Sequence, residues 1–455
     1  MEKSIIDKYN IPVPRYTSYP PANFFEETFT SNDYLHAIED SNSSQPSHIS
    51  FYIHIPFCRH MCHYCGCNSF PMMKQENIDR YVQALFKEID MVKPLLDKNR
   101  KIAQIHYGGG TPTVLPVVVL KEINEKLLEG FETIENPEIA IECHPGYLDE
   151  AYWRGLTQAH FNRFSLGIQD FNEEVLKGVN RRPSLVPVED IFNILRDANA
   201  RINMDFIYGL PLQSVESFTQ SIKKAIQLKP DRLVTFSYAH VPWVSKRQLI
   251  LEKLGLPSSE LKKELFETAS SLLTEAGYHL IGMDHFVKQD DELNIAVHHK
   301  QLHRNFQGYC TRRTTGQVYA FGVTGIGQLS SAYIQNCKNI EEYIQTIEES
   351  KLPIFKGYKL SNNEQIARFV IEALMCNYAI YWEDACQYFG ITKEQLLQAI
   401  HYDEQKLNEF KLDGLIQWRQ SGIEMTEEGK LFVRNIAASL DPLMVNTTKR
   451  FSKPV

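Results

Sequence analysis

Short apolar runs rich in β-branched residues recur through the first two thirds of the chain, and stretches with helical periodicity separate them. The apolar runs cover residues 48–55, 102–107, 139–142, 163–166, 202–207, 233–238 and 279–283. The helical stretches cover residues 79–92, 120–128, 186–198, 214–228 and 259–276. Strands and helices that alternate in this way form parallel βαβ units, so the pattern predicts an α/β barrel or a doubly wound sheet.

Polar or glycine-rich segments directly follow most of the predicted strands. They are residues 58–67, 108–113, 142, 169–170, 209–211 and 239–240. In an α/β barrel the site is built at the carboxyl ends of several strands at once. Six or seven strands that contribute to one site favour an open, partial barrel of the (β/α)6 type.

The two ends of the chain have a different character from its middle. Residues 1–47 contain several prolines, which predict an extended N-terminal arm with a short helix at 32–41. Residues 48–350 form the predicted barrel with its extension, and residues 351–455 form a mainly helical C-terminal domain. The helices expected in that domain cover residues 363–375, 382–388, 393–400 and 426–439.

Composition narrows the class of partner. The chain has 455 residues, 43% of them hydrophobic, and a formal net charge of -8. That charge argues against a general nucleic-acid binder and favours small-molecule partners. We find no signal peptide and no apolar run long enough to span a bilayer, so we expect a cytoplasmic protein. A monomer is expected because no exposed apolar stripe stands out.

A cysteine-rich loop, Cys58-x3-Cys62-x2-Cys65 followed by Cys67, comes directly after the first predicted strand. Three thiolates from one short loop can hold a 4Fe-4S cluster and leave one iron open. Zinc is the alternative, because the loop also contains His60 and His63. The other five cysteines are scattered singly and are expected to be small buried residues.

The polar groups after the other strands are candidates for binding a ligand. Three glycines at 108–110 let the backbone approach a ligand closely, although a tight turn would need them equally. Arg181 could pair with a carboxylate. The side chains suited to ribose hydroxyls, an adenine edge or an ammonium group are Glu142, Gln169, Asp170 and Asp205.

The spacing of Cys58, Cys62 and Cys65, with Tyr64 before the third cysteine, resembles the signature of the radical S-adenosylmethionine (SAM) enzymes. Residues 52–57 and 66–68 narrow the resemblance to the oxygen-independent coproporphyrinogen III oxidases. The likeness covers nearly the whole chain. Its other segments are residues 14–20, 108–113, 166–171, 207–211, 238–240, 282–286 and 303–309.

This resemblance implies a 4Fe-4S cluster held by Cys58, Cys62 and Cys65, with one SAM chelated by the fourth iron. The residues implied around that SAM are Tyr52, Gly109, Gly110, Thr111, Glu142, Gln169, Arg181, Asp205 and Ala239, with Arg181 on its carboxylate. The family binds a second SAM nearby, and the matching positions are Cys67, Phe306, Gln307 and Ile326. Cys67 is then functional without being a cluster ligand.

The implied reaction belongs to haem biosynthesis. A 5'-deoxyadenosyl radical removes a hydrogen from the β-carbon of two propionates of coproporphyrinogen III. Loss of CO2 and one electron from each then gives the vinyl groups of protoporphyrinogen IX. An electron donor such as flavodoxin or ferredoxin is expected, and Arg15 or Arg304 is a candidate partner for the substrate carboxylates.

Two other haem-related readings remain open, and one residue departs from the family pattern. An anaerobic haem-degrading methyltransferase or a haem chaperone could share the barrel and the cluster. Cys67 and the N-terminal arm favour the oxidase over the chaperone, because chaperone relatives usually lack the cysteine after Gly66 and have a shorter N-terminus. His144 stands where many relatives have an acidic residue, which could alter hydrogen bonding near the SAM.

Overall fold

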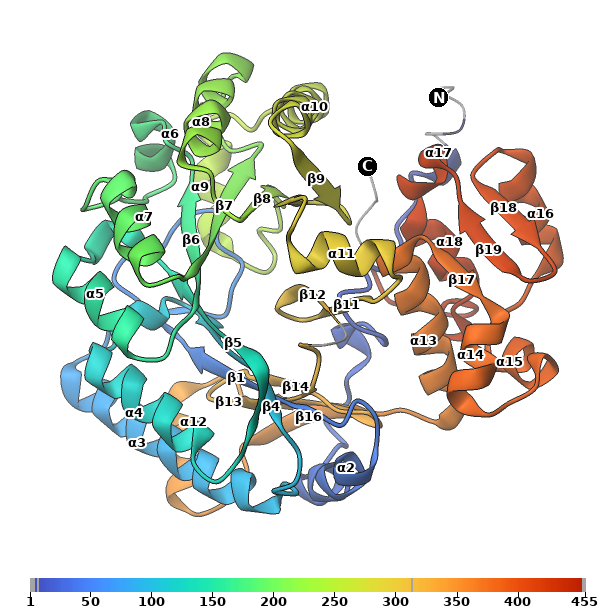
Figure 1. Cartoon of the computed structure of the whole chain (residues 1–455), viewed down its shortest axis with the longest axis horizontal. Coiled ribbons are helices and arrows are strands. Elements are labelled where there is room, and N and C mark those ends of the chain that lie inside the picture. Colours follow the sequence, from blue (N-terminus) through green and yellow to red (C-terminus); the bar gives the residue numbers. More distant parts are fainter. Residues whose placement is uncertain (1–4, 6–7, 312–313, 452–455) are drawn as a thin grey trace.

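A twelve-stranded sheet forms the body of the protein (Figure 1) in a computed structural model that describes residue 5, residues 8–311 and residues 314–451. The strand order is β16-β15-β14-β13-β1-β4-β5-β6-β7-β8-β10-β9. Six neighbouring strands at its centre are parallel: β1 (Ile49–Ile55), β4 (Ile102–Gly109), β5 (Thr133–Cys143), β6 (Arg163–Gln169), β7 (Arg201–Tyr208) and β8 (Arg232–Ser237). They curve into an open arc, which confirms the predicted partial (β/α)6 barrel.

Helices cover the outside of this arc (Figure 1). They are α3 (Gln75–Val92), α4 (Val117–Leu128), α5 (Glu150–Gln158), α6 (Glu173–Gly178), α7 (Val188–Asp197), α8 (Val215–Leu228) and α10 (Ser259–Glu275). Five of them overlap the stretches predicted from periodicity. Helices α5 and α6 were not predicted; side-chain caps from Asp149 and Asn172 begin them.

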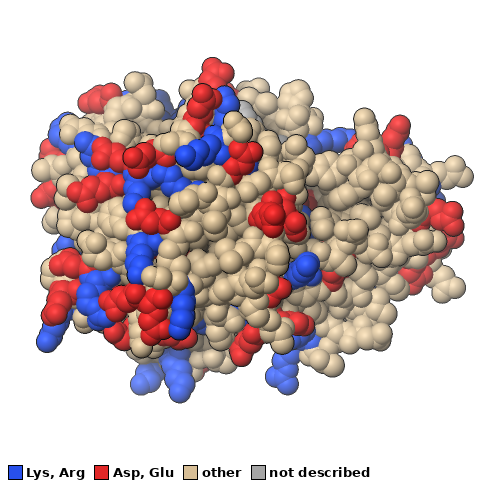
Figure 2. Space-filling view, turned by 90° about the horizontal axis from the view of Figure 1, so that it is seen from below, with Lys and Arg blue, Asp and Glu red and all other residues tan. Residues whose placement is uncertain are grey.

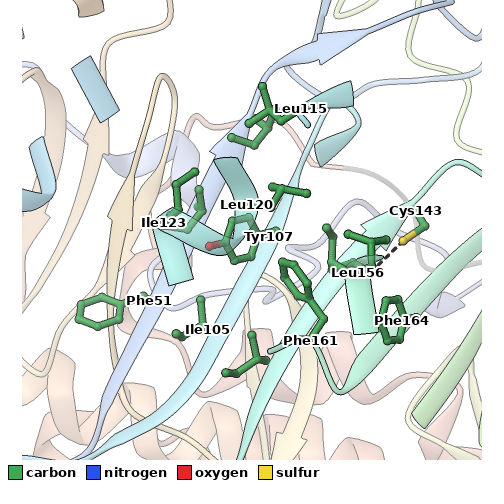
Figure 3. Close-up of a cluster of buried hydrophobic side chains, with 14 of the residues drawn as sticks. Phe51, Ile105, Tyr107, Leu115, Leu120, Ile123, Cys143, Leu156, Phe161 and Phe164 are labelled. Atoms are coloured by element: carbon green, nitrogen blue, oxygen red, sulfur yellow. Dashed lines mark hydrogen bonds between the residues drawn. The ribbon is translucent and has the colours of Figure 1, made fainter. Parts of the chain in front are cut away.

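The core lies between the strands and these outer helices. Figure 3 shows Ile105 and Tyr107 of β4 directed towards Leu120 of α4 and Leu156 of α5, with Phe161 packed beside them. The rings of Tyr107 and Phe161 meet edge to face, with their centroids 5.1 Å apart. Because side chains alternate along a strand, the residues between these apolar positions point into the barrel instead.

Both edges of the parallel arc are extended by antiparallel strands. On the β1 side, β13 (Gln317–Phe321) is still parallel to β1, and the strands that follow it are antiparallel: β14 (Ile326–Gln328), β15 (Ala332–Asn336) and β16 (Ile354–Lys359). Strand β16 therefore joins the large sheet although it lies after residue 350, where the sequence places a change in character.

The other edge corrects one sequence prediction. The apolar run at 279–283 lies in β9 (Tyr278–Ile281), but β9 is not a parallel barrel strand. It pairs antiparallel with β10 (His285–Lys288), which pairs antiparallel with β8. The physical reason is the short connection between β9 and β10, because a tight turn can join only antiparallel neighbours. Gly282, with φ of 62°, lies in that turn.

Shorter elements complete the barrel half of the protein. They are β2 (Phe57–Cys58), β3 (Phe70–Pro71), α9 (Leu249–Glu252), α11 (Glu292–His298), β11 (Leu302–Asn305), β12 (Gly308–Thr311) and α12 (Ile340–Glu348). Strands β11 and β12 form a separate hairpin, and β2 pairs with β3. The hairpin lies between the barrel and the C-terminal domain in Figure 1.

The C-terminal domain contains more strand than the sequence indicates. Its helices are α13 (Asn362–Asn377), α14 (Trp382–Phe389), α15 (Lys393–Ala399), α16 (Glu404–Leu412), α17 (Glu427–Lys430) and α18 (Val433–Ser439). The helix predicted at 426–439 is therefore two helices. The domain also contains a three-stranded antiparallel sheet of β17 (Ala379–Tyr381), β18 (Ile416–Arg419) and β19 (Gly422–Met425).

The N-terminal arm packs on this C-terminal domain. Its helix α2 (Ser31–Ser43) contacts strand β15 of the large sheet. The fully buried carboxylate of Asp441 accepts hydrogen bonds from the hydroxyls of Tyr16 and Tyr19, at 2.8 and 3.0 Å. Arg434 donates to the carbonyl of Pro14 at 3.0 Å. These contacts join segments more than 400 residues apart, so they hold the arm in place.

Asp441 makes arm docking dependent on pH. Burial raises the pKa of Asp441 from 3.8 to about 6, although the two tyrosine hydroxyls oppose this shift. The stability that this group contributes is fully present below pH 3.8 and is lost as the pH rises through 6. We expect the unfolding free energy of the protein, relative to that of Asp441→Asn, to fall by about 3 kcal/mol across this window in urea titrations.

Asp413 provides the control for that measurement. Its pKa is lowered by hydrogen bonds from Lys8 and Tyr9, so its contribution is lost as the pH falls. Asp413→Asn should therefore give a pH dependence of opposite sign. A flat difference between the wild type and Asp441→Asn would contradict the role of Asp441.

Figure 2 shows Lys and Arg side chains interspersed with Asp and Glu over one face, mostly on the barrel half. Within residues 8–311 and 314–451, no helix is long and apolar enough to cross a membrane.

Candidate active site at the carboxyl ends of the barrel strands

The cysteine loop begins at the end of β2 and is held by backbone contacts on both sides. The amide of Met72 donates to the carbonyl of Cys58 at 3.0 Å, and the amide of His63 donates to the carbonyl of Val179 at 3.0 Å. The side-chain amide of Asn180 donates to the carbonyl of Met61 at 3.0 Å. The loop is thus fixed between the β3 segment and the turn after α6.

The thiols of this loop lie in different surroundings. Cys58 and Cys62 are buried, Cys65 is half-buried and Cys67 is exposed. The Cys58 thiol lies 3.4 Å from the Thr111 hydroxyl. A hydrogen bond from Cys67 lowers the pKa of Cys65 to about 6, which favours the thiolate that iron requires. Among the described residues, no three His, Cys, Asp or Glu side chains are arranged to hold a single metal ion.

The glycine segment at the end of β4 packs directly against β1 and the residues that follow it. The amide of Gly110 donates to the carbonyl of Ile55, and that of Thr111 donates to the carbonyl of Phe57. A Cβ atom at Gly108 would lie 2.8 Å from a Glu142 carboxylate oxygen. Gly109 has φ of 112°, and a Cβ atom there would meet the ring of His54 at 2.7 Å. These positions admit only glycine, so the loop can approach the site more closely than any side chain would permit.

Two aromatic rings and a carboxylate line the barrel next to this loop. The rings of Tyr52 and His106 are stacked, with their centroids 6.0 Å apart. His106 Nε2 lies 3.2 Å from Glu142 Oε1. Glu142, which we predicted as a ligand contact, is therefore held at the end of β5 with one carboxylate oxygen already paired.

Asp205 lies on the neighbouring part of the rim. The hydroxyl of Ser165 donates to its carboxylate at 2.6 Å. Burial, followed by the charge of Glu142, raises the pKa of Asp205 to about 6, although the Ser165 hydroxyl opposes this shift. The rim therefore holds the carboxyl groups of both Glu142 and Asp205.

Arg181 and Gln169 meet at the end of β6. The Arg181 guanidinium donates to the Tyr64 hydroxyl at 3.1 Å, to the Cys62 sulfur at 3.6 Å and to the Gly167 carbonyl. Gln169 has φ of 69°, and its side-chain carbonyl oxygen is buried without a hydrogen-bond partner. A buried unpaired acceptor is costly, so this amide is poised to accept a hydrogen bond from a bound molecule.

Ala239 follows β8 and closes the rim near the cysteine loop. Its carbonyl accepts from the side-chain amide of Gln248 at 3.2 Å, and the same amide donates to the carbonyl of Tyr64 at 2.8 Å. Gln248 is almost fully buried. It therefore joins the end of β8 to the cysteine loop.

Hydrogen bonds through His54 link the residue after Cys67 to the segment before Ile326. Burial lowers the pKa of His54 to about 4, so its ring is neutral. Its Nδ1 accepts from the Tyr52 hydroxyl at 3.1 Å, and its Nε2 lies 3.1 Å from the Asn68 carbonyl and 3.3 Å from the Thr324 hydroxyl. Thr324 lies two residues before Ile326, and Asn68 directly follows Cys67.

The other two residues predicted for a second SAM belong to the β11–β12 hairpin. Phe306 and Gln307 form the turn between β11 and β12. Phe306 and Ile326 both pack against the core that the arm shares with the C-terminal domain, and the ring of Phe306 meets that of Tyr333 at 6.1 Å.

Asp170 and His144, which the sequence singled out, are held by contacts within the protein. The carboxylate of Asp170 is fully buried and bonded to Gln213 and Ser221, so it joins β6 to the β7 loop and α8. His144 is also buried, its Nδ1 accepts from the amide of Gly146 at 3.1 Å, and burial lowers its pKa to about 2. Its ring is therefore neutral, and it caps the short turn after β5.

Sequence reasoning missed His54, His106, Ser165 and Gln248. A signal for the first three was present, because polar residues or glycine occupy every second position of the strands. The sets are Ser50, Tyr52 and His54 on β1, and Gln104, His106 and Gly108 on β4. Parallel strands buried on both faces are usually apolar throughout, so this alternation indicates a polar interior.

The lower part of that interior is an ionic network. Arg163 donates to Glu138 at 2.6 Å, to Asn203 at 3.0 Å and to Glu292 at 3.4 Å. Gln104 donates to Glu138 at 2.8 Å. These bonds connect β4, β5, β6, β7 and α11 across the barrel, below the candidate site.

The residues present fit an iron-sulfur cluster with a polar ligand beside it. One loop offers three thiols, and Arg181 provides positive charge next to Cys62. The glycine loop leaves space that a Cβ atom would fill, and Gln169 retains an unpaired acceptor. Each of these features suits a cluster and a nucleoside that carries polar groups.

Comparison with known proteins agrees with this geometry. Residues 52–225 match the Radical SAM superfamily. The chain is 38% identical to the oxygen-independent coproporphyrinogen III oxidase of Synechocystis sp., over 99% of this chain and 97% of that protein. It is also 38% identical to the Escherichia coli (strain K12) protein of the same name, over 96% and 94%.

A solved structure gives the same result for the fold. Coproporphyrinogen III oxidase from Escherichia coli, described as a radical SAM enzyme, superimposes with a TM-score of 0.87 at 34% sequence identity. The superposition covers 97% of this chain and 98% of the other. Similarity over the full length of both chains includes the arm and the C-terminal domain. The chain therefore belongs to the oxygen-independent coproporphyrinogen III oxidase family of radical SAM proteins.

Proposed function

We propose that this protein converts coproporphyrinogen III to protoporphyrinogen IX without oxygen, by oxidative decarboxylation of two propionate side chains in haem biosynthesis. The observation that carries this function is the cysteine loop at the mouth of the barrel, together with full-length similarity to oxidases of that name. The enzyme is an oxidoreductase of the radical SAM class. The relatives reported above give no support to the methyltransferase or chaperone readings.

Membership of the radical SAM superfamily implies a 4Fe-4S cluster and SAM, and we assign the cluster to Cys58, Cys62 and Cys65. When bound, this pair supplies a 5'-deoxyadenosyl radical. The chain's own groups position the SAM. Arg181, next to Cys62, would pair with its carboxylate. The residues assigned to the rest of this SAM site are Tyr52, Gly109, Gly110, Thr111, Glu142, Gln169, Asp205 and Ala239.

A second SAM is part of the proposal. It would lie between Cys67 on the cysteine loop and the group formed by Phe306, Gln307 and Ile326. Support comes from the bonds through His54, which hold the residue after Cys67 close to the segment before Ile326. Cys67 is also the one exposed cysteine of the loop.

The substrate carries four carboxylates, and two arginines are suited to bind them. The Nε and Nη1 atoms of Arg304 are shielded from solvent and have no hydrogen-bond partner, while its guanidinium lies 4.9 Å above the ring of Tyr309. A guanidinium in this state needs an anion. Arg15 on the arm is exposed. Burial, followed by the charge of Arg15, lowers the pKa of both Arg434 and Lys262.

We predict that Arg304→Gln raises the KM for coproporphyrinogen III about tenfold, because one charge-assisted hydrogen bond to a carboxylate is lost. Arg304→Lys should restore part of the affinity. Steady-state kinetics under anaerobic conditions measure both. The control is Arg80→Gln, which breaks only surface pairs with Glu341 and Glu348 and should leave the KM unchanged. An unchanged KM in Arg304→Gln would remove Arg304 from the substrate site.

The decisive test of the function is anaerobic reconstitution with iron and sulfide, followed by SAM, a reductant and coproporphyrinogen III. We expect 5'-deoxyadenosine, CO2 and protoporphyrinogen IX. A methyltransferase would give S-adenosylhomocysteine instead, and a chaperone would bind haem without turnover. A protein that cleaves SAM but forms no vinyl product would refute the oxidase reading. A colourless protein containing only zinc would refute all three readings.

The remaining parts of the proposal concern partners and location. We infer a monomer that works in the cytoplasm and receives its electrons from a carrier such as flavodoxin or ferredoxin. All nine cysteines lie in the described part of the chain and are free thiols, as is usual in a reducing compartment. Sedimentation would test whether the protein is a monomer, and pull-down of the carrier would test the source of the electrons.

A further inference from the structure

Cationic and aromatic side chains form a cluster on the outer side of the cysteine loop. Arg59 and Arg182 both lie over the ring of Tyr147, with their guanidinium carbons 5.6 and 5.3 Å from its centre. The ring of His60 stacks on the same tyrosine at 5.6 Å, and its Nδ1 lies 2.6 Å from the tyrosine hydroxyl. We call these four residues the cationic cluster.

This cluster adjoins the cysteines assigned to iron. Arg59 and His60 are two of the three residues between Cys58 and Cys62, and both are exposed while the two cysteines are buried. The Cys62 thiol is close enough to Tyr147 to affect its pKa, which burial raises. The cationic cluster is therefore the surface over this side of the cysteine loop.

The two arginines of the cationic cluster are free of salt bridges to the described residues. The chain has a formal net charge of -8, yet neither Arg59 nor Arg182 forms an ion pair with any described residue. A further cation, Arg247, acts electrostatically on Cys65 and His63 at the other end of the loop. Arginine and tyrosine are also the residues enriched at protein interfaces.

From these observations we propose that the cationic cluster is the docking surface for an acidic one-electron carrier protein that reduces the cluster. The proposal rests on the function proposed above, which requires an electron. The carrier is oxidised by one electron and the iron-sulfur cluster is reduced by one. Opposite charge on the two surfaces raises the rate of encounter and fixes the orientation of the carrier.

The test uses the reconstituted protein and an acidic flavodoxin reduced to its hydroquinone. Arg59→Glu and Arg182→Glu should each slow cluster reduction about tenfold at low ionic strength, measured by stopped-flow absorbance. The difference should vanish at high ionic strength, where surface charges are screened. Binding of flavodoxin by the cluster-free protein should weaken in parallel, and Arg182→Gln should give a smaller effect than Arg182→Glu.

Lys98→Glu is the matched control. Lys98 is exposed and precedes β4, so it lies at the amino ends of the strands, away from the cysteine loop. The Lys98→Glu substitution makes the same change in net charge as the arginine variants, and we expect flavodoxin to reduce the iron-sulfur cluster of this variant at the normal rate. Equal slowing in Lys98→Glu would overturn the proposal, because net charge alone would then explain the effect. Normal rates in both arginine variants would also overturn it.

Reduction by dithionite at high ionic strength separates this proposal from the function itself. The arginine variants should cleave SAM at the normal rate under these conditions. Loss of cleavage there would mean a distorted loop and would count against the docking role. If the unaltered protein fails to cleave SAM with dithionite, the proposed function fails instead.

Discussion

Cys65→Ala should abolish the iron-sulfur cluster, whereas Cys67→Ala should keep the cluster and lose activity. Cys65 is assigned as the third iron ligand, and a 4Fe-4S cluster with one open iron has no ligand to spare. Cys67 lies beside it, with its amide 3.4 Å from the Cys65 sulfur. The two variants therefore remove equivalent atoms at neighbouring positions with different expected results.

Iron and sulfide content after anaerobic reconstitution, together with the absorbance of the cluster, measures this prediction. Cys143→Ala is a control for loss of a thiol, because Cys143 is buried in the core next to β6 (Figure 3) and should not affect iron content. A cluster that survives in Cys65→Ala but is lost in Cys67→Ala would mean that the ligand assignment is reversed. Loss in both would assign four cysteine ligands and leave no open iron for SAM.

Arg163→Met should destabilise the protein by about 3–5 kcal/mol, the usual cost of removing one partner from a buried ion pair. Arg163 and Glu138 are both largely buried inside the barrel and are 2.6 Å apart. Burial alone would raise the pKa of Glu138, but the charges of Arg163 and Arg232 lower it to about 2. Without Arg163 this carboxylate stays in the interior with less compensation. Urea denaturation monitored by circular dichroism gives the free energy of unfolding.

The same pair predicts a pH effect. Because the pKa of Glu138 is lowered from 4.5 to about 2, its contribution is present above pH 4.5 and is lost as the pH falls through about 2. Arg163→Met should therefore differ most from the wild type above pH 4.5. Arg154→Met is the control, since its pair with Glu150 is exposed and is expected to contribute less than about 1 kcal/mol. Equal losses in the two variants would contradict the role of the interior network.

Several features of the site could be read from the sequence because their signals are local. Each of these signals lies within a few positions of the end of its own strand. They are the cysteine spacing, the glycines at 108–110 and the acidic residue at the end of the 139–142 run. Strand ends that share one edge of a parallel sheet lie close together. Local pattern therefore predicted that the segment 108–113 and the cysteine loop would share one site, and the hydroxyl of Thr111 is 3.4 Å from the Cys58 sulfur.

Other features have no local signal because they depend on partners far away in the chain. His54 and Gln248 resemble ordinary polar residues until the fold places them against Thr324 and Tyr64. The cationic cluster is of the same kind, since its members come from the cysteine loop, the turn after β5 and the segment after α6. Nothing in the sequence around Arg182 or Tyr147 indicates that the guanidinium of Arg182 lies over the ring of Tyr147.

The sequence by itself determined the alternation of strands and helices, the partial barrel and the loop that supplies the thiols. Periodicity and spacing are properties of residues that are close together in the chain, so they can be read without knowledge of the fold. The tertiary structure alone decided that β9 runs antiparallel beyond β10, that β16 joins the large sheet and that Asp441 holds the arm. These outcomes depend on which surfaces, far apart in the chain, pack against each other. Because the hydrophobic effect is non-directional, the apolar pattern of one segment does not specify which other segment will cover it.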